Sequence, residues 1–338
     1  MSTPPLIPDH ALIGLAKGIP TTPTTPILSL SPLILQIPQR PVPLQLKITI
    51  PTTGSLLPII LLSHGQGSSN NLSSMNGYGP LVTFYASHGF AVIQPTHLSS
   101  KTLKLSSQDL ERGIPKSKSG EGPLFWKSRV QDFKDILDRK EEIEEGFEAA
   151  RGRLDWDSVG VVGHSMGAHT ASILLGAQSK NAHETIDMKE PRIRAGVLIG
   201  APGCDPGGHT QTAMAREVAP FFADTSFEEM ESPALVVYGD EDVPDYLTTR
   251  GLEWHRDPYV LGGGKKDLLT VRGAGHCFGG VSGWDAKECV DESVERCEVV
   301  RRMTAAYLRS QLGHGYGAWN DACEALEKLE GVGMVERK

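Results

Sequence analysis

A serine between two glycines is the residue of this sequence best suited to nucleophilic chemistry. Residues 163–167 read Gly-His-Ser-Met-Gly, with an apolar run before them and a run of small residues after them. Such flanks predict a strand that turns sharply into a helix, which places the hydroxyl of Ser165 at the positive end of the helix dipole. Glycines are needed because side chains at those positions would clash in so tight a turn. We therefore expect Ser165 to be a nucleophile; a plain strand-to-helix turn is the alternative.

A serine hydroxyl needs a base, and the base needs an acid that orients it. In the chain order typical of this arrangement, the acid and then the histidine each follow a later strand. Asp242 follows an apolar run in a Gly-x-x-Asp pattern, and His276 follows the next run in Gly-Ala-Gly-His. We predict Asp242 as the acid and His276 as the base, with Asp240 and Asp245 as less favoured acids.

The tetrahedral intermediate of acyl transfer also needs hydrogen-bond donors for its oxyanion. The backbone N–H of Met166, directly after the serine, is one candidate donor. The N–H of Gln66 is the other, because it lies in a His-Gly-x-Gly loop that follows an apolar run. His64, which opens this loop, is expected to brace the loop rather than to react.

The residues that we expect around a substrate pocket are His64, Gly67, Phe125, Trp126, His164, His209 and Phe278.

The pattern of apolar runs predicts a sheet that brings these residues together. Short, almost wholly apolar runs that end in Gly, His, Asp or Pro are typical of strands covered by helices on both faces. They occupy residues 57–65, 90–97, 158–165, 194–202, 233–242 and 267–276. Segments with helical spacing lie at 126–149, 166–176, 285–312 and 317–330. This alternation predicts an α/β fold with a mostly parallel central sheet and helices on both faces.

The chain is expected to form one domain, residues 27–338, behind an N-terminal arm. Residues 1–26 are rich in proline and lack periodicity, so we expect them to be loosely attached. Alternating runs within 27–51 contain prolines, which predicts antiparallel strands at one edge of the sheet. Insertions at the rim of the site, the first a solvated loop or a lid, and extra C-terminal helices are expected at 99–122, 203–231 and 285–330.

Bulk composition excludes several kinds of partner. The net charge of −8 argues against nucleic acid and against an anionic membrane, because both require a basic face. No run approaches the roughly 18 apolar residues of a membrane span, and no secretory signal is expected at the N-terminus.

The number of cysteines is odd and their spacing fits no zinc pattern, so we expect free thiols in a cytoplasmic compartment. They are Cys204, Cys277, Cys289, Cys297 and Cys323.

No metal and no cofactor are expected. The sequence lacks the His-Glu-x-x-His, Cys-x-x-Cys and P-loop patterns. The acidic cluster at 240–245 is an alternative cation site, but the need for a triad acid explains it better. Nothing in the sequence sets the oligomeric state or the acyl group of a substrate.

These motifs together resemble those of the α/β-hydrolases. Within that superfamily the chain is similar to dienelactone-hydrolase-like proteins, platelet-activating-factor acetylhydrolases, plant chlorophyllases and bacterial polyester hydrolases. The similar segments, between residues 57 and 278, are LPIILLSHGQGSSNN, GFAVIQPTHLSS, RVQDFKDILD, DSVGVVGHSMGAHTA, LVVYGDEDVP and GAGHCF. The resemblance implies a metal-free esterase with the triad and oxyanion amides named above. Dienelactone hydrolases proper differ because they have cysteine where this chain has Ser165, and secreted polyester hydrolases differ by a signal and disulfides that we do not expect here.

Cleavage of a small-molecule carboxylic ester through an acyl-enzyme on Ser165 is therefore the leading hypothesis. Biosynthetic cyclases, thioesterases and condensation catalysts use the same triad, and weak turnover of all simple esters would favour one of them. A non-catalytic ligand-binding module is a minor alternative, which a Ser165 unreactive toward fluorophosphonates would favour.

Overall fold

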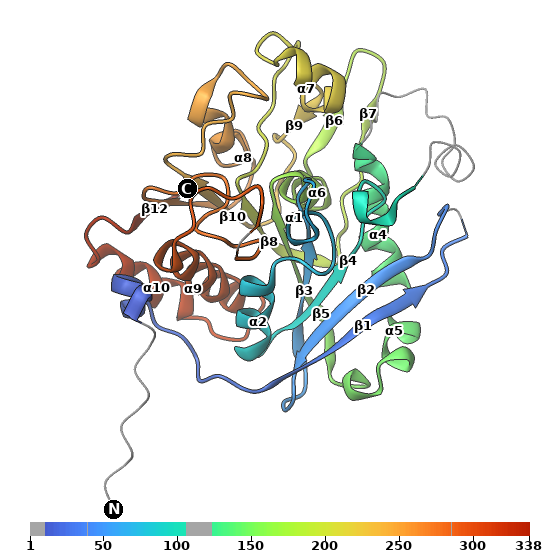
Figure 1. The fold of residues 1–338 in the computed structure, drawn as a ribbon, viewed down its shortest axis with the longest axis vertical. Coiled ribbons are helices and arrows are strands. Elements are labelled where there is room, and N and C mark those ends of the chain that lie inside the picture. Colours follow the sequence, from blue (N-terminus) through green and yellow to red (C-terminus); the bar gives the residue numbers. More distant parts are fainter. Residues whose placement is uncertain (1–10, 39, 106–123, 285) are drawn as a thin grey trace, which may run out of the picture.

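A computed structural model describes residues 11–38, 40–105, 124–284 and 286–338 (Figure 1). Its centre is a nine-stranded sheet of order β1-β2-β4-β3-β5-β8-β10-β11-β12. The strands are β1 (Ile27–Leu35), β2 (Leu44–Pro51), β3 (Leu57–Ser63), β4 (Ala91–Pro95), β5 (Leu154–His164), β8 (Ile193–Ile199), β10 (Ala234–Gly239), β11 (Lys266–Val271) and β12 (Gly333–Arg337). A small antiparallel sheet consists of β6 (Gln178–Lys180), β7 (Thr185–Ile186) and β9 (Thr225–Ser226).

The strands from β4 to β11 in the sheet order are parallel, and both edges of the sheet are antiparallel. The α/β prediction with antiparallel N-terminal edge strands is thus confirmed. In register, Ser63 of β3 pairs with Gly163 of β5, and His164 pairs with Ile199 of β8. The loops that follow these parallel strands therefore meet at one edge of the sheet, where open α/β sheets bind their ligands.

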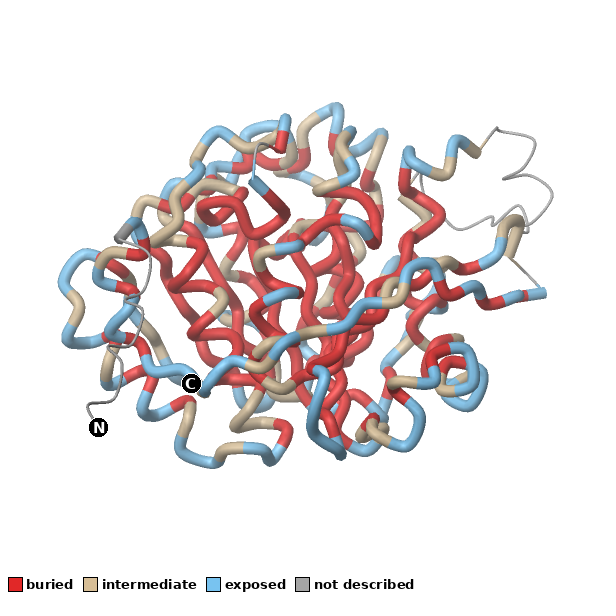
Figure 2. The backbone as a smooth tube through the Cα atoms, turned by 60° about the horizontal axis from the view of Figure 1, so that its bottom comes forward, coloured by how far each residue is buried: buried red, intermediate tan, exposed pale blue. Residues whose placement is uncertain are grey.

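Helices cover both faces of the sheet. The α-helices are α1 (Asn70–Ser73), α2 (Gly79–Ser87), α4 (Trp126–Asp138), α5 (Lys140–Gly146), α6 (Met166–Leu174), α7 (Ala213–Val218), α8 (Asp257–Val260), α9 (Val294–Gln311) and α10 (Ala318–Glu327). Helices α4, α5 and α6 bury their apolar side chains in one core, and α2, α9 and α10 bury theirs in the other. The tube in Figure 2 shows the buried residues gathered in the interior and the exposed residues along the outside.

Two predicted helices differ in extent from the observed ones. The segment 126–149 is divided at Arg139, whose backbone leaves the helical conformation, so that α4 and α5 are separate helices. The helix predicted from residue 285 begins at Val294, because the side chain of Ser293 caps it by accepting the N–H of Arg296. Residues 286–293 form a loop instead, in which Val290 is 98% exposed.

Residues 11–19 of the N-terminal arm are packed against the domain, whereas most of residues 20–26 are exposed. A 3₁₀ helix, η1 (Ala11–Gly18), lies against α9 and α10 (Figure 1). Ile13, Ala16 and Ile19 recur every three residues and are buried. Arg302 of α9 donates to the carbonyl of Ile19 at 2.8 Å. The apolar spacing within the proline-rich stretch was the signal for this contact; residues 1–10 lie outside the described part.

The two expected insertions are described to different extents. Residues 203–231 contain α7, β9 and a 3₁₀ helix, η5 (Pro220–Phe222), and so have secondary structure of their own. Of 99–122, the structure describes only 99–105, in which Ser99 and Ser100 are buried and η2 (Lys101–Leu103) follows them. The prediction of a solvated loop or lid concerns residues 106–122, which lie outside the described part.

The expectation of five free thiols is wrong for one pair. Cys277 and Cys289 form a disulfide, with their Cα atoms 5.6 Å apart. Their pairing was missed because the sequence placed Cys289 on a helix, whereas the loop 286–293 returns over the segment that follows β11. Cys204, Cys297 and Cys323 are free and buried. Among the described residues, we find no helix with the length and apolar character that crossing a membrane requires.

Candidate active site

Ser165 occupies a strained turn between β5 and α6. Its φ is +56° and its ψ is −123°, a conformation that a side chain disfavours. A Cβ on Gly163 would lie 2.0 Å from the carbonyl oxygen of Gly167, and a Cβ on Gly167 would lie 2.0 Å from that of Ser63. Both flanking glycines are thus required by backbone contacts. The Ser165 N–H donates to the carbonyl of Ile199 at 2.9 Å, which fixes the turn beside the end of β8.

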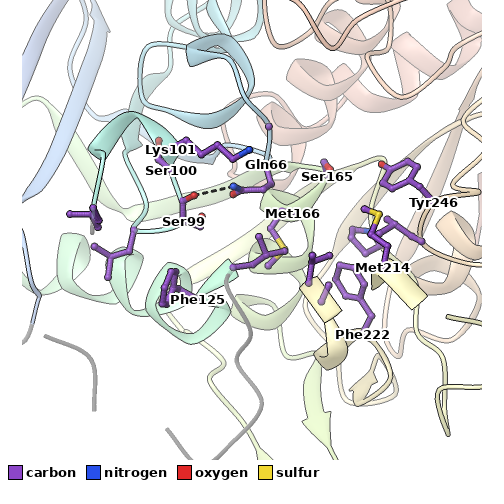
Figure 3. A pocket seen from close by; sticks show the side chains of 18 of the residues that line it. Gln66, Ser99, Ser100, Lys101, Phe125, Ser165, Met166, Met214, Phe222 and Tyr246 are labelled. Carbon is purple, nitrogen blue, oxygen red and sulfur yellow. Dashed lines mark hydrogen bonds between the residues drawn. The ribbon is translucent and has the colours of Figure 1, made fainter. Parts of the chain in front are cut away.

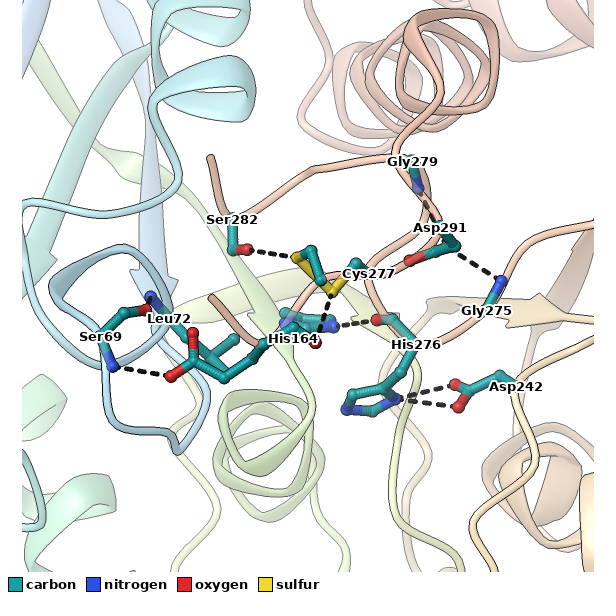
Figure 4. The surroundings of a disulfide bond; sticks show 12 residues. Ser69, Leu72, His164, Asp242, Gly275, His276, Cys277, Gly279, Ser282 and Asp291 are labelled. Carbon is teal, nitrogen blue, oxygen red and sulfur yellow. Dashed lines mark hydrogen bonds and ion pairs between the residues drawn. A yellow bond between two sulfur atoms is a disulfide. The ribbon is translucent and has the colours of Figure 1, made fainter. Parts of the chain in front are cut away.

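His276 and Asp242 form a hydrogen-bonded pair beside this turn. The Nδ1 of His276 donates to the two carboxylate oxygens of Asp242 at 2.9 and 3.0 Å (Figure 4). A Cβ on Gly200, the residue after Ile199, would lie 3.2 Å from Asp242 Oδ2 and 3.3 Å from His276 Cε1. The ends of β5, β8, β10 and β11 thus bring together the three residues predicted as a triad. In the described part of the chain, no hydrogen bond joins the Ser165 hydroxyl to His276. In serine hydrolases this hydrogen bond often forms fully only when substrate is bound.

Charge and burial act in opposite directions on this pair. Burial alone would raise the pKa of Asp242, but His276 and His255 hold that pKa well below its ordinary value. Burial alone would lower the pKa of His276, but the Asp242 carboxylate and, more weakly, Asp291 raise it above the ordinary value. The His276 side chain is 28% exposed and that of Asp242 only 4%. A buried acid that stays ionised therefore faces a histidine whose side chain is partly exposed.

His255 is a neighbour of this pair that the sequence did not reveal. It lies in η6 (Gly251–Arg256), where its Nδ1 donates to the carbonyl of Ala201 at 2.7 Å. Its Nε2 lies 3.5 Å from Asp242 Oδ2, and its ring stacks at 6.0 Å on that of His276. No signal marked it, because it follows no strand and belongs to no motif. Asp242, His255 and His276 have the grouping of a metal site, but the direct His276–Asp242 hydrogen bond favours a shared proton there.

The loop predicted to supply an oxyanion donor lies next to the serine. Gln66, Gly67, Ser165 and Met166 line one cavity of about 640 Å³ (Figure 3). Met166 is the first residue of α6, and the N–H groups of a first helical turn have no partner within the helix. The side chain of Gln66 is turned away to donate to the carbonyl of Ser99 at 2.9 Å. This geometry leaves the two backbone amides beside the same cavity as the serine.

His64 braces this loop from beneath. The side chain is buried, its Nδ1 donates to the carbonyl of Gly65 at 2.7 Å, and its Nε2 accepts the N–H of His97 at 3.1 Å. Burial and the charge of Arg129 lower the pKa of His64 well below its ordinary value, so the ring stays neutral in this tautomer. The bracing role expected from the sequence agrees with these contacts, while a place in the pocket lining does not.

Arg129 ties three segments of the site together. Its guanidinium donates to the carbonyl of His64, to Ser99 Oγ at 2.7 Å and to Thr170 Oγ1 of α6 at 3.1 Å. The side chain is fully buried, and that burial lowers the pKa of Arg129 to about 9. One cation thus holds the oxyanion loop, the segment after β4 and the helix that carries the serine.

We expect Arg129→Lys to lower the free energy of unfolding by about 1–3 kcal/mol, because an ammonium cannot replace a fork of donors and leaves buried acceptors unpaired. Urea denaturation measures this. Arg139→Lys is the matched control, because Arg139 lies directly after α4 and, among the residues that the structure describes, its side chain pairs with the exposed Glu142 alone. Its replacement should change stability by less than about 0.5 kcal/mol. Equal effects of the two substitutions would contradict the bracing role.

The cavity beside Ser165 is mainly apolar, with two lysines at its rim. Its apolar lining residues are Leu98, Leu105, Leu124, Phe125, Met166, Pro202, Met214, Val218, Ala219, Phe222, Tyr246 and Leu247. Lys101 and Lys104 are exposed members of the lining. Most of these residues come from the segments around both insertions. Such a lining suits an apolar group of moderate size attached to the bond that Ser165 would attack.

The pocket residues named from the sequence are divided by the structure. Gly67 and Phe125 line the cavity. Trp126, Phe278 and His164 are buried outside it, and His209 is exposed on the insertion. His164 donates from Nε2 to the carbonyl of His276 at 2.7 Å and accepts from the Tyr78 hydroxyl at 3.0 Å. Burial lowers the pKa of His164 to about 3, so this neutral ring supports the histidine loop rather than the substrate.

Ser165 lies in a strained turn between β5 and α6, and an acid and a histidine follow it in chain order at the ends of later parallel strands. This arrangement on a mostly parallel sheet makes the protein an α/β-hydrolase. The chain belongs to the serine hydrolase (FSH1) family, a model of which matches residues 61–246. The matched stretch includes Ser165 and Asp242 and ends before His276. None of the four groups to which the sequence is similar is singled out by this match. No curated protein matches the chain.

Proposed function

We propose that the protein hydrolyses carboxylic esters through an acyl-enzyme on Ser165. The observation that carries the proposal is the His276–Asp242 hydrogen bond of 2.9 Å beside a serine in a strained turn that opens on an apolar cavity. In serine hydrolases generally, such a pair serves as general base and orienting acid. We assign the same roles to His276 and Asp242 and the oxyanion hole to the N–H groups of Gln66 and Met166.

The reaction would proceed in two halves. Ser165 Oγ attacks the ester carbonyl carbon while its proton passes to His276 Nε2, and the carbonyl oxygen becomes an oxyanion held by two amides. Collapse of this intermediate breaks the bond to the alcohol, which leaves with the proton from His276. Water then attacks the acyl-enzyme with His276 again as base, which releases the acid and restores the serine. Throughout, the low pKa of Asp242 keeps it ionised beside the imidazolium.

The substrate we propose is a small-molecule ester with an apolar acyl or alcohol group of medium size. The cavity volume of about 640 Å³ and its aliphatic and aromatic lining support this choice. Fluorophosphonate labelling followed by a panel of p-nitrophenyl esters of increasing acyl length tests it. Labelling at Ser165 with best turnover at intermediate length is the expected result; unlabelled, folded protein would overturn the assignment.

Cyclisation, thioester cleavage and condensation use the same triad and stay predictions of lower rank. The ester panel also discriminates these reactions from ester hydrolysis, since uniformly weak turnover of simple esters would favour them.

A cytoplasmic location likewise stays a prediction. The Cys277–Cys289 disulfide removes part of its support, because that prediction relied on free thiols.

We expect kcat/KM to fall on acidification with a midpoint above pH 6.5, the ordinary pKa of a histidine, because His276 must be neutral to accept the serine proton and Asp242 raises its pKa. Above that midpoint the profile should be flat until other groups titrate. A pH–rate profile for a p-nitrophenyl ester gives the value. A rate that is constant between about pH 5 and about pH 8 would contradict a histidine base.

A further inference from the structure

One short loop contacts both of the loops that the proposed reaction needs in place. This loop, residues 286–293, is called the bracing segment here. Its Cys289 is joined by the disulfide to Cys277, the residue directly after His276 (Figure 4). Two of its carboxylates, Glu288 and Asp291, lie on either side of this half-cystine in the sequence.

Glu288 holds the oxyanion loop. Its Oε1 accepts the N–H of Ser68 at 2.6 Å and that of Ser69 at 2.7 Å. Burial would raise the pKa of Glu288, but these hydrogen bonds lower it, so the acceptor is a carboxylate. A Cβ on Gly67 would lie 2.9 Å from the same oxygen, which shows how closely the loop backbone approaches the carboxylate. The residue before Gly67 is Gln66, whose amide is the proposed oxyanion donor.

Asp291 holds the histidine loop. Its Oδ2 accepts the N–H of Gly275 at 3.0 Å and that of Gly279 at 3.3 Å (Figure 4). These two residues lie on either side of His276 in the sequence. The N–H of Ser293 also donates to the carbonyl of Gly279 at 3.0 Å. The bracing segment therefore fixes both the base and an oxyanion donor, through charge-assisted hydrogen bonds to backbone amides.

We propose that Glu288 and Asp291 are positioning residues for the reaction and that the Cys277–Cys289 disulfide makes their effect depend on redox state. The proposal rests on the esterase function proposed above. With the disulfide intact, a covalent bond keeps the two carboxylates beside their amides. After reduction the covalent tie is lost, and residues 286–293 are held by non-covalent contacts, among them those hydrogen bonds and the Ser293 contact. The loops that carry Gln66 and His276 are then less closely fixed. A displacement of about 1 Å in such groups costs on the order of 10²-fold in rate.

A dithiol is the reductant that the proposal requires. Its thiolate attacks Sγ of Cys289, which is half-buried next to the fully exposed Val290, whereas Cys277 is buried. The S–S bond breaks, Cys277 leaves as a thiolate and takes a proton, and the second thiol of the reductant then displaces Cys289. Two electrons and two protons pass to the protein, and the reductant becomes a cyclic disulfide. In reducing compartments, disulfides of this kind are usually transient and redox-sensing.

The first experiment compares the oxidised protein with protein treated with dithiothreitol, its thiols counted by alkylation and mass spectrometry. We expect reduction to lower kcat for a p-nitrophenyl ester by about 10–10²-fold with little change in KM, because the oxyanion contact is made only in the transition state. Reoxidation should restore kcat. Cys289→Ser should resemble the reduced protein and ignore dithiothreitol, while Cys323→Ser, which removes a free thiol, should respond as the wild type does.

A second set of variants separates positioning from folding. Glu288→Ala should lower kcat by about 10-fold or more, and Glu288→Gln should recover most of it, because an amide oxygen still accepts the two N–H groups. Lys287→Ala, an exposed neighbour on the same segment, is the matched control and should leave kcat unchanged. Hydrogen exchange at the amides of Ser68, Ser69 and Gly275 should quicken on reduction while the exchange of β5 amides does not.

Fully reduced protein that keeps its kcat and the protection of these amides would overturn the inference. Failure of the oxidised wild type to turn over esters or to label at Ser165 would instead overturn the proposed function. Hydrogen exchange would then still decide whether the bracing segment and its disulfide hold the two loops.

Discussion

Ser165→Ala is expected to lower kcat for p-nitrophenyl esters by on the order of 10⁶-fold, the loss seen when a triad serine is removed. Without Oγ no acyl-enzyme forms, and only the binding cavity and the oxyanion amides are left to accelerate attack by water. Initial rates of the purified variant, with its fold checked by circular dichroism, measure the loss.

Ser172→Ala is the matched control for this substitution. Ser172 is buried on α6, the same helix that Ser165 precedes, and its hydroxyl donates to the carbonyl of Ala168 within that helix. Its loss should leave kcat within a factor of about 2, since nothing at the reacting atoms changes. A Ser165 variant that retained more than about a hundredth of the wild-type rate would mean that another group attacks the substrate.

Replacing the proposed base should be nearly as damaging. His276→Gln is expected to lower kcat by on the order of 10⁶-fold, whereas Asp242→Asn should cost on the order of 10⁴-fold, because the amide keeps the geometry but favours the wrong tautomer of the ring. The Asp242 variant should also shift the acidic limb of the pH–rate profile to lower pH, since the carboxylate that raises the pKa of His276 is gone. Steady-state rates at several pH values test both expectations.

The control here is a histidine paired with an acid away from the site. His314 is 30% exposed and lies 3.6 Å from Asp155, so His314→Gln should leave both kcat and its pH dependence unchanged. If His276→Gln kept a rate within tenfold of the wild type, the base would have to be sought elsewhere, and His255, 3.5 Å from Asp242, would be the next residue to replace.

The features predicted correctly are those that the local sequence determines. A strand covered on both faces is apolar almost throughout, so β3, β4, β5, β8, β10 and β11 were all visible as runs. Likewise the strained turn at Ser165 needs glycines on both sides, because a Cβ at either position would come within 2.0 Å of a backbone oxygen, which explains why that pattern is so specific. Chain order also pointed to Asp242 and His276, whose catalytic roles stay predictions; the structure places His276 Nδ1 2.9 Å from Asp242 Oδ2.

The features that were missed depend on contacts between distant segments. Strand β12 is partly exposed and, within the described part of the chain, pairs with β11 alone, so its own sequence carries little signal. His255 reaches Asp242 from a 3₁₀ helix with no motif. Cys289 pairs with Cys277 because a loop, not a helix, precedes α9. Pocket lining was the least predictable, since His164 and Phe278 pack beneath the site while Met214 and Phe222 come from an insertion.

The backbone of Ser165 has a consequence for how this protein would respond to selection. A non-glycine residue at φ +56° and ψ −123° costs on the order of 1–3 kcal/mol. That is a large share of the free energy of unfolding of a typical domain, which is about 5–15 kcal/mol. Glycine at this position would relieve that cost and remove the hydroxyl at once. Screening for heat resistance alone would thus favour inactive descendants, so only a screen that also demands turnover would retain the serine.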